Sequence, residues 1–188
     1  MNGRQVAEAV ILMSVSAVLY GLGCEMQVWI FQFAEHLSGV HWFYLPAGLR
    51  VLLVLVAGIY GALGIFAATV AINLWHLPHL NGPEVALTAV ASGFSAWIAL
   101  WLMRLMGSIS ESLSGLTSAA LLQFAILYSA TNAILHQCVR WSFKHDDALL
   151  VVDIWPMFVG DLLGAIVFLY VLKLVLVARK PKPRTFGV

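Results

Sequence analysis

The sequence predicts an all-α, polytopic membrane protein with five to six transmembrane passes and a glycine-rich broken or re-entrant stretch over residues 49–75. Of its 188 residues, 62% are hydrophobic and only 10% are charged, and the mean hydropathy is +0.93. Soluble domains have about half apolar and a quarter charged residues. The chain has the length of one domain, which we expect to be a transmembrane bundle over residues 1–178, followed by a short basic tail at residues 179–188.

Four apolar stretches reach the roughly 20 residues that a helix needs to cross a membrane, and they carry few charges. They are Val6 to Gly23, Val85 to Met103, Leu116 to Ile134 and Ile154 to Val177. Arg4 precedes the first stretch, but no small-residue cleavage site follows before Glu25. We therefore expect a retained span and not a cleaved signal peptide.

A fifth stretch, Leu49 to Trp75, does not have the length of a simple span. As one helix it would measure about 40 Å, too long for one upright crossing and too short for two. Gly58, Gly61 and Gly64 lie at its middle, where glycine permits a kink or a re-entrant turn between two half-helices, and all three are candidates for close helix packing. Broken backbone at membrane depth persists only where other helices or a water-filled cavity satisfy it.

Charge placement predicts the orientation of the bundle. The residues directly after the last span are basic, namely Arg179, Lys180, Lys182 and Arg184. By the positive-inside rule the C-terminus lies in the cytoplasm, and we expect a bacterial inner membrane. Arg4 favours the same side for the N-terminus, and therefore six passes over five. The basic tail is also suited to contact anionic lipids.

The two cysteines bear on the number of passes. With six passes, Cys24 and Cys138 both lie near the outer surface and are able to form a disulfide, whereas five passes would separate them. Two unpaired membrane thiols are the alternative.

The segment from Cys24 to Gly48 is rich in aromatic residues, which concentrate at membrane interfaces. Val28 to Leu37 has the pattern of a short interfacial helix, with Glu35 and His36 facing water. Leu45-Pro46-Ala47-Gly48 then has the composition of a turn that starts the next helix.

Ionisable residues inside a span cost several kcal/mol unless they are paired or hydrated, so Asp161 is the first candidate for a site. It lies in the last span between Gly160 and Gly164, a pair of small residues that lets another helix approach closely. Arg50 follows the helix-start turn. It either extends to the interface or anchors a carboxylate, Asp161 or Asp153, or an anionic ligand.

One face of the helix expected from Leu116 to Ile134 is polar, and this face continues to His136 at its outer end. Ser129, Asn132 and His136 follow one another at helical spacing. His136 is either solvated near the outer end of this helix or part of a buried site. We therefore predict a cavity that holds a small ligand or an ion pair, lined by Arg50, Asn132, His136 and Asp161.

The support for a metal, cofactor or nucleic-acid site is weak. His76 and His79 lie near Glu84, but Pro78 breaks the helical face that zinc ligands would use, so they are weak metal candidates. No cofactor is expected, and a net charge of +1 without a basic stripe does not indicate nucleic-acid binding. The serines of the Met106 to Gly115 turn have no convincing base beside them, so no enzyme is predicted.

Two parts of the chain form short motifs. One is Trp42 to Arg50 with the following glycine-containing run that ends Ala71-Ile72-Asn73-Leu74-Trp75, and the other is Gly160 to Gly164. They resemble elements of the membrane-associated sensor domains of the MASE type-one family, which precede diguanylate cyclases and histidine kinases in bacteria. The matches cover about a third of the chain. Family members usually have more spans and an output domain, so the resemblance implies a stand-alone sensor module that signals through another protein.

We therefore expect a sensory or signalling component that binds a small ligand or a partner inside the bundle, contacts a membrane or cytoplasmic protein, and is able to form homo-oligomers. Two alternatives stay open. Substrate-binding subunits of energy-coupling-factor transporters have a similar length and six helices, and they would dock through small residues of the first span, here Ala7, Ala9, Ser14, Ser16 and Ala17. A structural subunit of a larger complex would bury its glycine faces against protein and lack a polar cavity.

Overall fold

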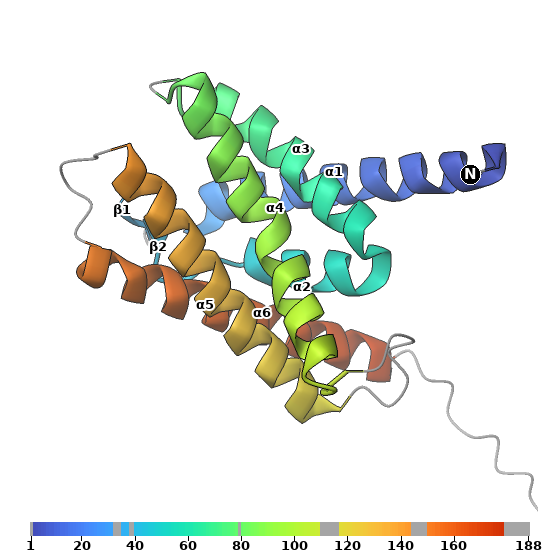
Figure 1. Ribbon diagram of the computed structural model, residues 1–188. Helices are drawn as coiled ribbons and strands as arrows, with labels where there is room; N and C mark the ends of the chain where they lie inside the picture. The colour runs from blue at the N-terminus through green and yellow to red at the C-terminus, as the bar shows by residue number, and fades with distance from the viewer. Residues whose placement is uncertain are drawn as a thin grey trace, which may run out of the picture.

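The computed structural model describes residues 2–31, 35–37, 40–78, 80–109, 117–143 and 150–178. Over these residues the chain forms six helices and a small antiparallel hairpin (Figure 1). In chain order they are α1 (Gly3–Phe31), β1 (Glu35–Leu37), β2 (Val40–His41), α2 (Pro46–Ala57), α3 (Ile59–His76), α4 (Gly82–Leu105), α5 (Ser118–Ser142) and α6 (Leu150–Ala178). Within the described ranges, all helices except α2 are long and apolar enough to cross a membrane. The predicted helical membrane bundle is confirmed.

Side-chain caps fix where α4 and α5 begin. Asn81 accepts a hydrogen bond of 3.0 Å from the backbone N–H of Glu84, and Thr117 accepts one of 3.1 Å from that of Ala120. Such caps satisfy N–H groups that the first turn of a helix leaves unpaired. Both helices thus start where a polar loop gives way to an apolar run, close to the predicted boundaries.

The predicted break in the stretch over residues 49–75 occurs at Gly58, between α2 and α3. Gly58 has φ 56° and ψ −129°, a conformation that favours glycine. With 12 residues, α2 is about 18 Å long and too short to cross the hydrocarbon alone. Gly58 has no neighbouring atom within 4 Å of its Cβ position, so it makes the break and not a helix-packing contact, whereas Gly61 and Gly64 are the packing residues. They lie within helix α3 and let backbone approach closely, Gly61 next to Leu53 of α2 and Gly64 next to Met13 of α1.

Consecutive helices alternate in direction, which follows from contacts near their ends. α1 and α3 run parallel, because Gly64 near the start of α3 packs on Met13, and His76 at its end lies 2.8 Å from Glu25. α2 and α6 also run parallel, with Gly48 packed against Phe168. The start of α1 and the end of α6 consequently lie at the same end of the bundle (Figure 1).

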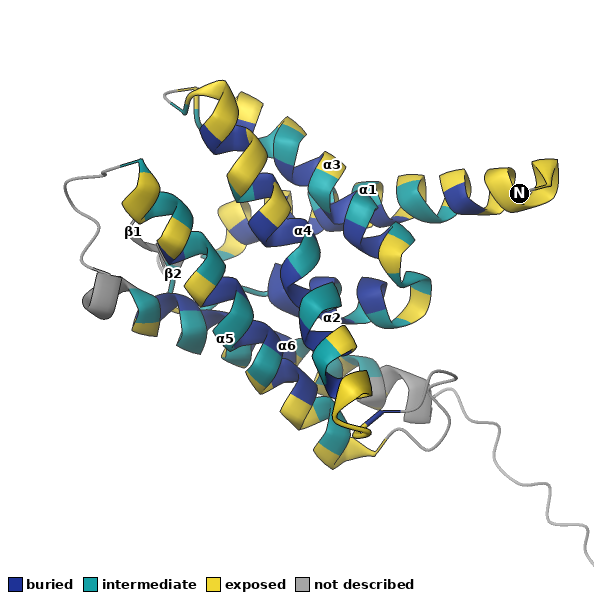
Figure 2. Ribbon diagram, in the orientation of Figure 1, coloured by how far each residue is buried: buried dark blue, intermediate teal, exposed yellow. Residues whose placement is uncertain are grey.

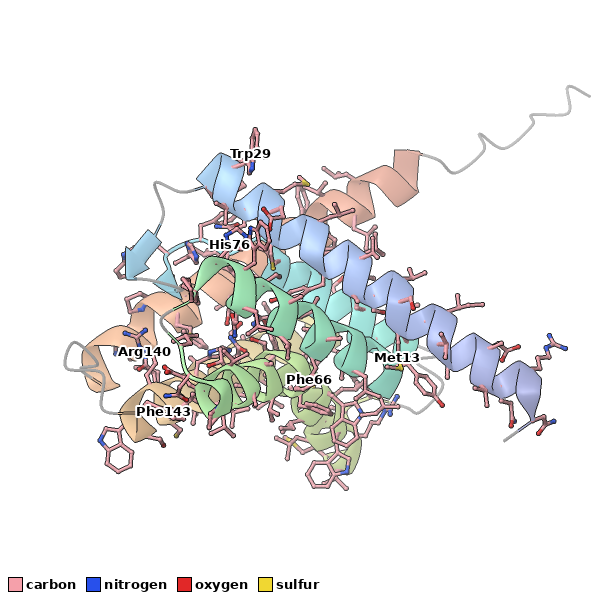
Figure 3. All side chains as sticks on the ribbon, turned by 90° about the horizontal axis from the view of Figure 1, so that it is seen from above. Met13, Trp29, Phe66, His76, Arg140 and Phe143 are labelled. Carbon is pink, nitrogen blue, oxygen red and sulfur yellow. The ribbon has the colours of Figure 1, made fainter. Side chains whose placement is uncertain are left out.

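The opposite end, here called the hairpin end, contains the β1–β2 hairpin and the C-terminal ends of α1, α3 and α5. Trp29, His76, Arg140 and Phe143 all lie toward it, whereas Met13 lies farther along α1 toward the N-terminus (Figure 3). The prediction of a separate interfacial helix from Val28 is wrong, because α1 continues through Phe31 and the chain then enters β1. Trp29 is 87% exposed at the end of α1, a position suited to the membrane interface.

Burial is concentrated where α2 is surrounded by the other helices, and the outward faces of the bundle are apolar and exposed (Figure 2). The buried cluster around α2 includes Tyr20, Val51, Val54, Phe124 and Tyr128. The N-terminal part of α1 projects from the bundle, with Val10 and Ile11 exposed. A short helix that carries Arg50 is thus held in the middle of the molecule.

Candidate functional site

Arg50 is the centre of a buried hydrogen-bond network. Its helix starts at Pro46, so the side chain enters the bundle just over one turn below the hairpin end, and the residue is only 4% exposed. Nε donates to the hydroxyl of Tyr20 at 2.8 Å, and Nη2 donates to the same hydroxyl. Nη1 donates to Tyr128 at 3.3 Å and to Oδ1 of Asn132 at 3.0 Å. Nη2 also donates to Oγ of Ser92 at 3.3 Å.

These bonds use all the hydrogen-bonding capacity of the guanidinium group, which has five N–H donors and no acceptor. The four acceptors come from α1, α4 and α5. Because a buried cation is tolerated only when its donors are satisfied, this set of neutral oxygens explains how Arg50 remains inside the bundle. It also joins four helices at one point.

Tyrosine rings complete the surroundings of Arg50. Its Cζ lies 5.2 Å from the ring centroids of both Tyr20 and Tyr44, within the range of cation–π attraction. The hydroxyls of Tyr20 and Tyr44 are 3.1 Å apart, and the Tyr44 hydroxyl lies 3.4 Å from Sγ of Cys24. The network therefore continues from Arg50 to the segment between β2 and α2.

Asn132 connects Arg50 to Asp161. Its Oδ1 accepts from Arg50, and its Nδ2 donates to Oδ2 of Asp161 at 2.6 Å. Among the described side chains, Arg50 and Asp161 form no direct ion pair, so the pairing considered from the sequence is mediated by an amide. Asp161 is 2% exposed, and it compensates the charge of Arg50 through this bridge. The other carboxylate considered, Asp153, lies outside the described side chains.

His136 joins the network through Ser92, whose Oγ lies 3.1 Å from Nε2 of the imidazole. Ser129, predicted on the same polar face, does not take part. Its hydroxyl donates to the carbonyl of Ala125 at 2.8 Å, which is the usual way in which a helical serine satisfies itself.

The predicted site residues Arg50, Asn132, His136 and Asp161 all line one cavity of about 50 Å³. The remaining lining residues are His41, Tyr44 and Met157. A volume of this size holds one or two water molecules or a group of a few atoms. The structure thus brings together four residues that are up to 111 positions apart in the sequence, from Arg50 to Asp161.

The segment from His41 to Leu45 closes one side of the cavity and packs on α6. A Cβ atom at Gly160 would overlap the carbonyl oxygen of His41, and one at Gly164 would overlap that of Tyr44. The backbone N–H of Tyr44 donates to the carbonyl of Gly160 at 3.1 Å. The two glycines do allow a close approach, but the approaching element is this irregular segment and not the predicted helix.

Gln27 holds the same segment from the other side and was not predicted from the sequence. Its Nε2 donates to the carbonyl of Phe43 at 2.7 Å, and its Oε1 accepts from the backbone N–H of Leu45 at 3.0 Å. Gln27 is 1% exposed. The signal that would have identified it is a glutamine near the end of an apolar helix, directly before a stretch whose backbone needs partners.

Replacement of Gln27 by leucine should release the His41–Leu45 segment. It removes two hydrogen bonds and leaves backbone groups of Phe43 and Leu45 unsatisfied, which should lower the free energy of unfolding by about 1–3 kcal/mol. Cys24, which is 8% exposed and contacts Tyr44, reports on this release through faster maleimide labelling in a Cys138→Ser background. Gln123→Leu, at an exposed position of α5, is the matched control. Equal labelling in the two variants would contradict this role of Gln27.

The weak metal candidates are not assembled into a site by the part of the chain described. His79 lies outside the described residues, and Nε2 of His76 contacts Oε1 of Glu25 at 2.8 Å. Within the described residues, no group of three or more His, Cys, Asp or Glu side chains is placed to hold a metal ion.

The disulfide considered between the two cysteines is absent. Cys24 is buried and Cys138 is exposed, and both are free thiols, so they do not form the disulfide considered from the sequence. The basic tail at residues 179–188 and most of the serine-containing turn, residues 110–116, lie outside the described residues.

Comparison of the chain with family models, curated proteins and solved structures gives no match.

Proposed function

We propose that this chain is a sensory or signalling component of a membrane that binds a small polar ligand in the cavity between Arg50 and Asp161. The observation that carries the proposal is the convergence of Arg50, Asn132, His136 and Asp161 on one cavity. Charged groups inside a helical bundle are costly and are typically retained at ligand, ion or proton sites. A bundle that needed only to be stable could fill this space with apolar side chains.

The cavity is placed to affect the His41–Leu45 segment. His41 and Tyr44 line it, and the same segment is held by Gln27 of α1 and by the glycines of α6. A ligand that favours one position of this segment would shift the packing of α1 on α6, and thereby the population of two conformations. Such a shift is how binding at one end of a bundle reaches a partner protein.

The sensor assignment also draws on the resemblance of the Trp42–Arg50 and Gly160–Gly164 motifs to MASE type-one sensor domains. We place the protein in a bacterial inner membrane with the C-terminus in the cytoplasm, because of the basic tail at residues 179–188. The hairpin end and the cavity then face outward. The partner that receives the signal is a membrane or cytoplasmic protein at the opposite end.

The transporter and structural-subunit alternatives are less well supported by the arrangement of the helices. Ser16, one of the small residues that would form a transporter docking surface, is buried and packs on Gly64 of α3 instead. Gly160 and Gly164 are likewise covered by the chain's own His41–Leu45 segment. Because these small residues pack against other parts of the same chain, fewer of them are accessible for docking to another subunit.

The experiment is maleimide labelling of Cys24 in the purified protein, with Cys138→Ser as background and Asp161→Asn as the variant. Because Asp161→Asn leaves the charge of Arg50 uncompensated, we expect Cys24 to label roughly tenfold faster, equivalent to about 1.4 kcal/mol in the opening equilibrium. Glu8→Gln, which neutralises an exposed carboxylate near the start of α1 and far from Cys24, is the control and should label like the parent.

Two readouts complete this test. Thermal unfolding confirms that the labelled variants remain folded, and mass spectrometry of the parent identifies any small molecule that copurifies. Identical labelling of parent and Asp161→Asn, together with no retained molecule, would overturn the proposed sensing role.

A further inference from the structure

The hydrogen bonds around Arg50 have a direction, because arginine donates and never accepts. Tyr20, Tyr128, Asn132 and Ser92 must therefore be acceptors in their bonds to Arg50. Any hydrogen bond that one of these groups donates must therefore go to an atom other than those of Arg50. This constraint sets the direction of the tyrosine and asparagine branches of the network.

The tyrosine branch leads from Arg50 to Cys24. The Tyr20 oxygen accepts from both Nε and Nη2 of Arg50, which occupies its two lone pairs. Its own O–H is therefore the donor in the 3.1 Å bond to Tyr44. This branch ends at the 3.4 Å contact of Tyr44 with Cys24.

The serine branch leads from Arg50 to His136. Oγ of Ser92 accepts from Arg50, and it lies 3.1 Å from Nε2 of His136. A serine hydroxyl has one proton and two lone pairs, so this contact forms with either tautomer of the imidazole. In both cases Nε2 of His136 is used by its bond to Ser92.

The asparagine branch ends at the carboxylate of Asp161. Asn132 accepts from Arg50 with Oδ1 and donates to Oδ2 of Asp161 with Nδ2. Within the described part of the chain, Oδ1 of Asp161 receives no hydrogen bond. Asp161 also lines the cavity. Of the two branch ends that line the cavity, His136 uses Nε2 in its contact with Ser92, whereas Asp161 presents Oδ1 as an acceptor toward the cavity.

We propose that the ligand of this cavity is a proton, delivered by water from the hairpin end to Oδ1 of Asp161, and that Arg50 stops it from passing farther. Hydronium transfers one proton to Oδ1, an O–H bond forms, a water molecule is left, and the carboxylate becomes a neutral carboxylic acid. Conduction past Arg50 would require the guanidinium to accept a proton, which it does not do. The cavity is therefore a one-sided proton site and not a channel. This inference rests on the proposed sensing function and names its ligand.

Other titratable groups lie on the elements that pack against α6, which are α2, α5 and β2. They are Arg50 on α2; Tyr128, His136, Cys138 and Arg140 on α5; His41 on β2; and Tyr44 after it. His41 and His136 are the members whose ordinary titration lies near neutral pH. His41 stacks on Tyr44, with ring centroids 5.5 Å apart, so the test must separate it from Asp161.

The test is infrared difference spectroscopy of the full chain reconstituted in lipid vesicles, with the pH of the external medium as the variable. Impermeant maleimide on the exposed Cys138, which lies near the hairpin end of α5, measures the fraction of molecules with that end outward. Acidification outside should produce the C=O band of a protonated carboxyl group in that fraction. The band should be absent from Asp161→Asn and retained in Glu25→Gln and His41→Gln.

A pH-sensitive dye trapped inside the vesicles reports on conduction. We expect no internal acidification above that of protein-free vesicles. Internal acidification that depends on Asp161, or a band that survives in Asp161→Asn, would overturn the proposal, as would a band produced equally by molecules with the hairpin end inward.

The carboxyl band and the labelling of Cys24 distinguish failure of the proton site from failure of the sensing role. If no carboxyl band appears but Asp161→Asn still accelerates Cys24 labelling, the proton is not the ligand and the sensing role stands. If the band appears but labelling does not change and no small molecule copurifies, the proton site stands and the sensing role fails.

Discussion

Replacement of Arg50 by methionine is expected to destabilise the bundle more than any other single change at the site. Methionine fills a similar volume, but it removes every donor that serves Tyr20, Tyr128, Asn132 and Ser92. It also leaves Asp161 as an uncompensated buried charge. Removing one of two buried charges that compensate each other, here through Asn132, costs roughly 3–5 kcal/mol. The free energy of unfolding, measured by titration of the detergent-solubilised protein with a denaturing detergent, should fall by about this amount.

Two further variants separate the charge of Arg50 from its geometry. Arg50→Lys keeps a cation but presents three donors from a single atom instead of a planar fork, so it should recover only part of the loss. Adding Asp161→Asn to Arg50→Met removes the orphaned charge and should also recover part of it, as a positive coupling in a double-mutant cycle. Additive effects would show that the two charges do not communicate through Asn132.

Arg4→Met is the matched control for the loss of an arginine. The Arg4 side chain is 90% exposed, and its contact is a 3.0 Å ion pair with Glu8 one turn away. Exposed pairs of this kind contribute little, so unfolding of this variant should match that of the parent. A loss similar to that of Arg50→Met would indicate that charge number, and not the buried network, sets the stability.

Replacement of Gly164 by alanine is expected to have the second largest effect. The new methyl group would overlap the carbonyl oxygen of Tyr44, which is backbone and cannot rotate away. The His41–Leu45 segment would have to move off α6, which should also weaken the bond from Tyr44 to Gly160. Overpacking of this kind costs about 1–3 kcal/mol, and the upper part of that range applies here. Unfolding and Cys24 labelling measure the two consequences together.

Gly21→Ala provides the comparison for Gly164→Ala. Gly21 lies in α1, and no neighbouring atom lies within 4 Å of the position that an alanine methyl group would take there. Alanine also favours a helix more than glycine does. This variant should be as stable as the parent or slightly more stable. If Gly164→Ala were also as stable as the parent, that result would contradict the close packing of the His41–Leu45 segment on α6.

The spans and the break at Gly58 were predictable because they depend on local properties. Long apolar runs form helices in lipid regardless of their neighbours, and three closely spaced glycines mark a weak point. The β1–β2 hairpin was not predictable in this way. The aromatic residues after Cys24 suit an interfacial helix as well as an extension of α1, and only packing on α6 decides the course of the chain there.

The charged residues of the site were predictable from the sequence, but its neutral residues were not. Arg50 and Asp161 are conspicuous because charge inside a membrane needs an explanation. Tyr20, Tyr128 and Ser92 are not, because single tyrosines and serines occur in many membrane helices and satisfy themselves locally. Ser129, which was included on spacing alone, does this. The residues that complete the network are identified only by their distance from Arg50.

The position of Arg50 also constrains how the protein is made. During synthesis α2 emerges when only Tyr20, of its hydrogen-bond partners, already exists. Ser92 follows 42 residues later and Asn132 82 residues later, delays of roughly 2–8 s and 4–16 s at about 5–20 residues per second. Through this interval the guanidinium lacks most of its acceptors. We expect α2, which is too short to span the bilayer, to wait at the lipid–water boundary with Arg50 hydrated, and to be drawn inward only when α5 arrives.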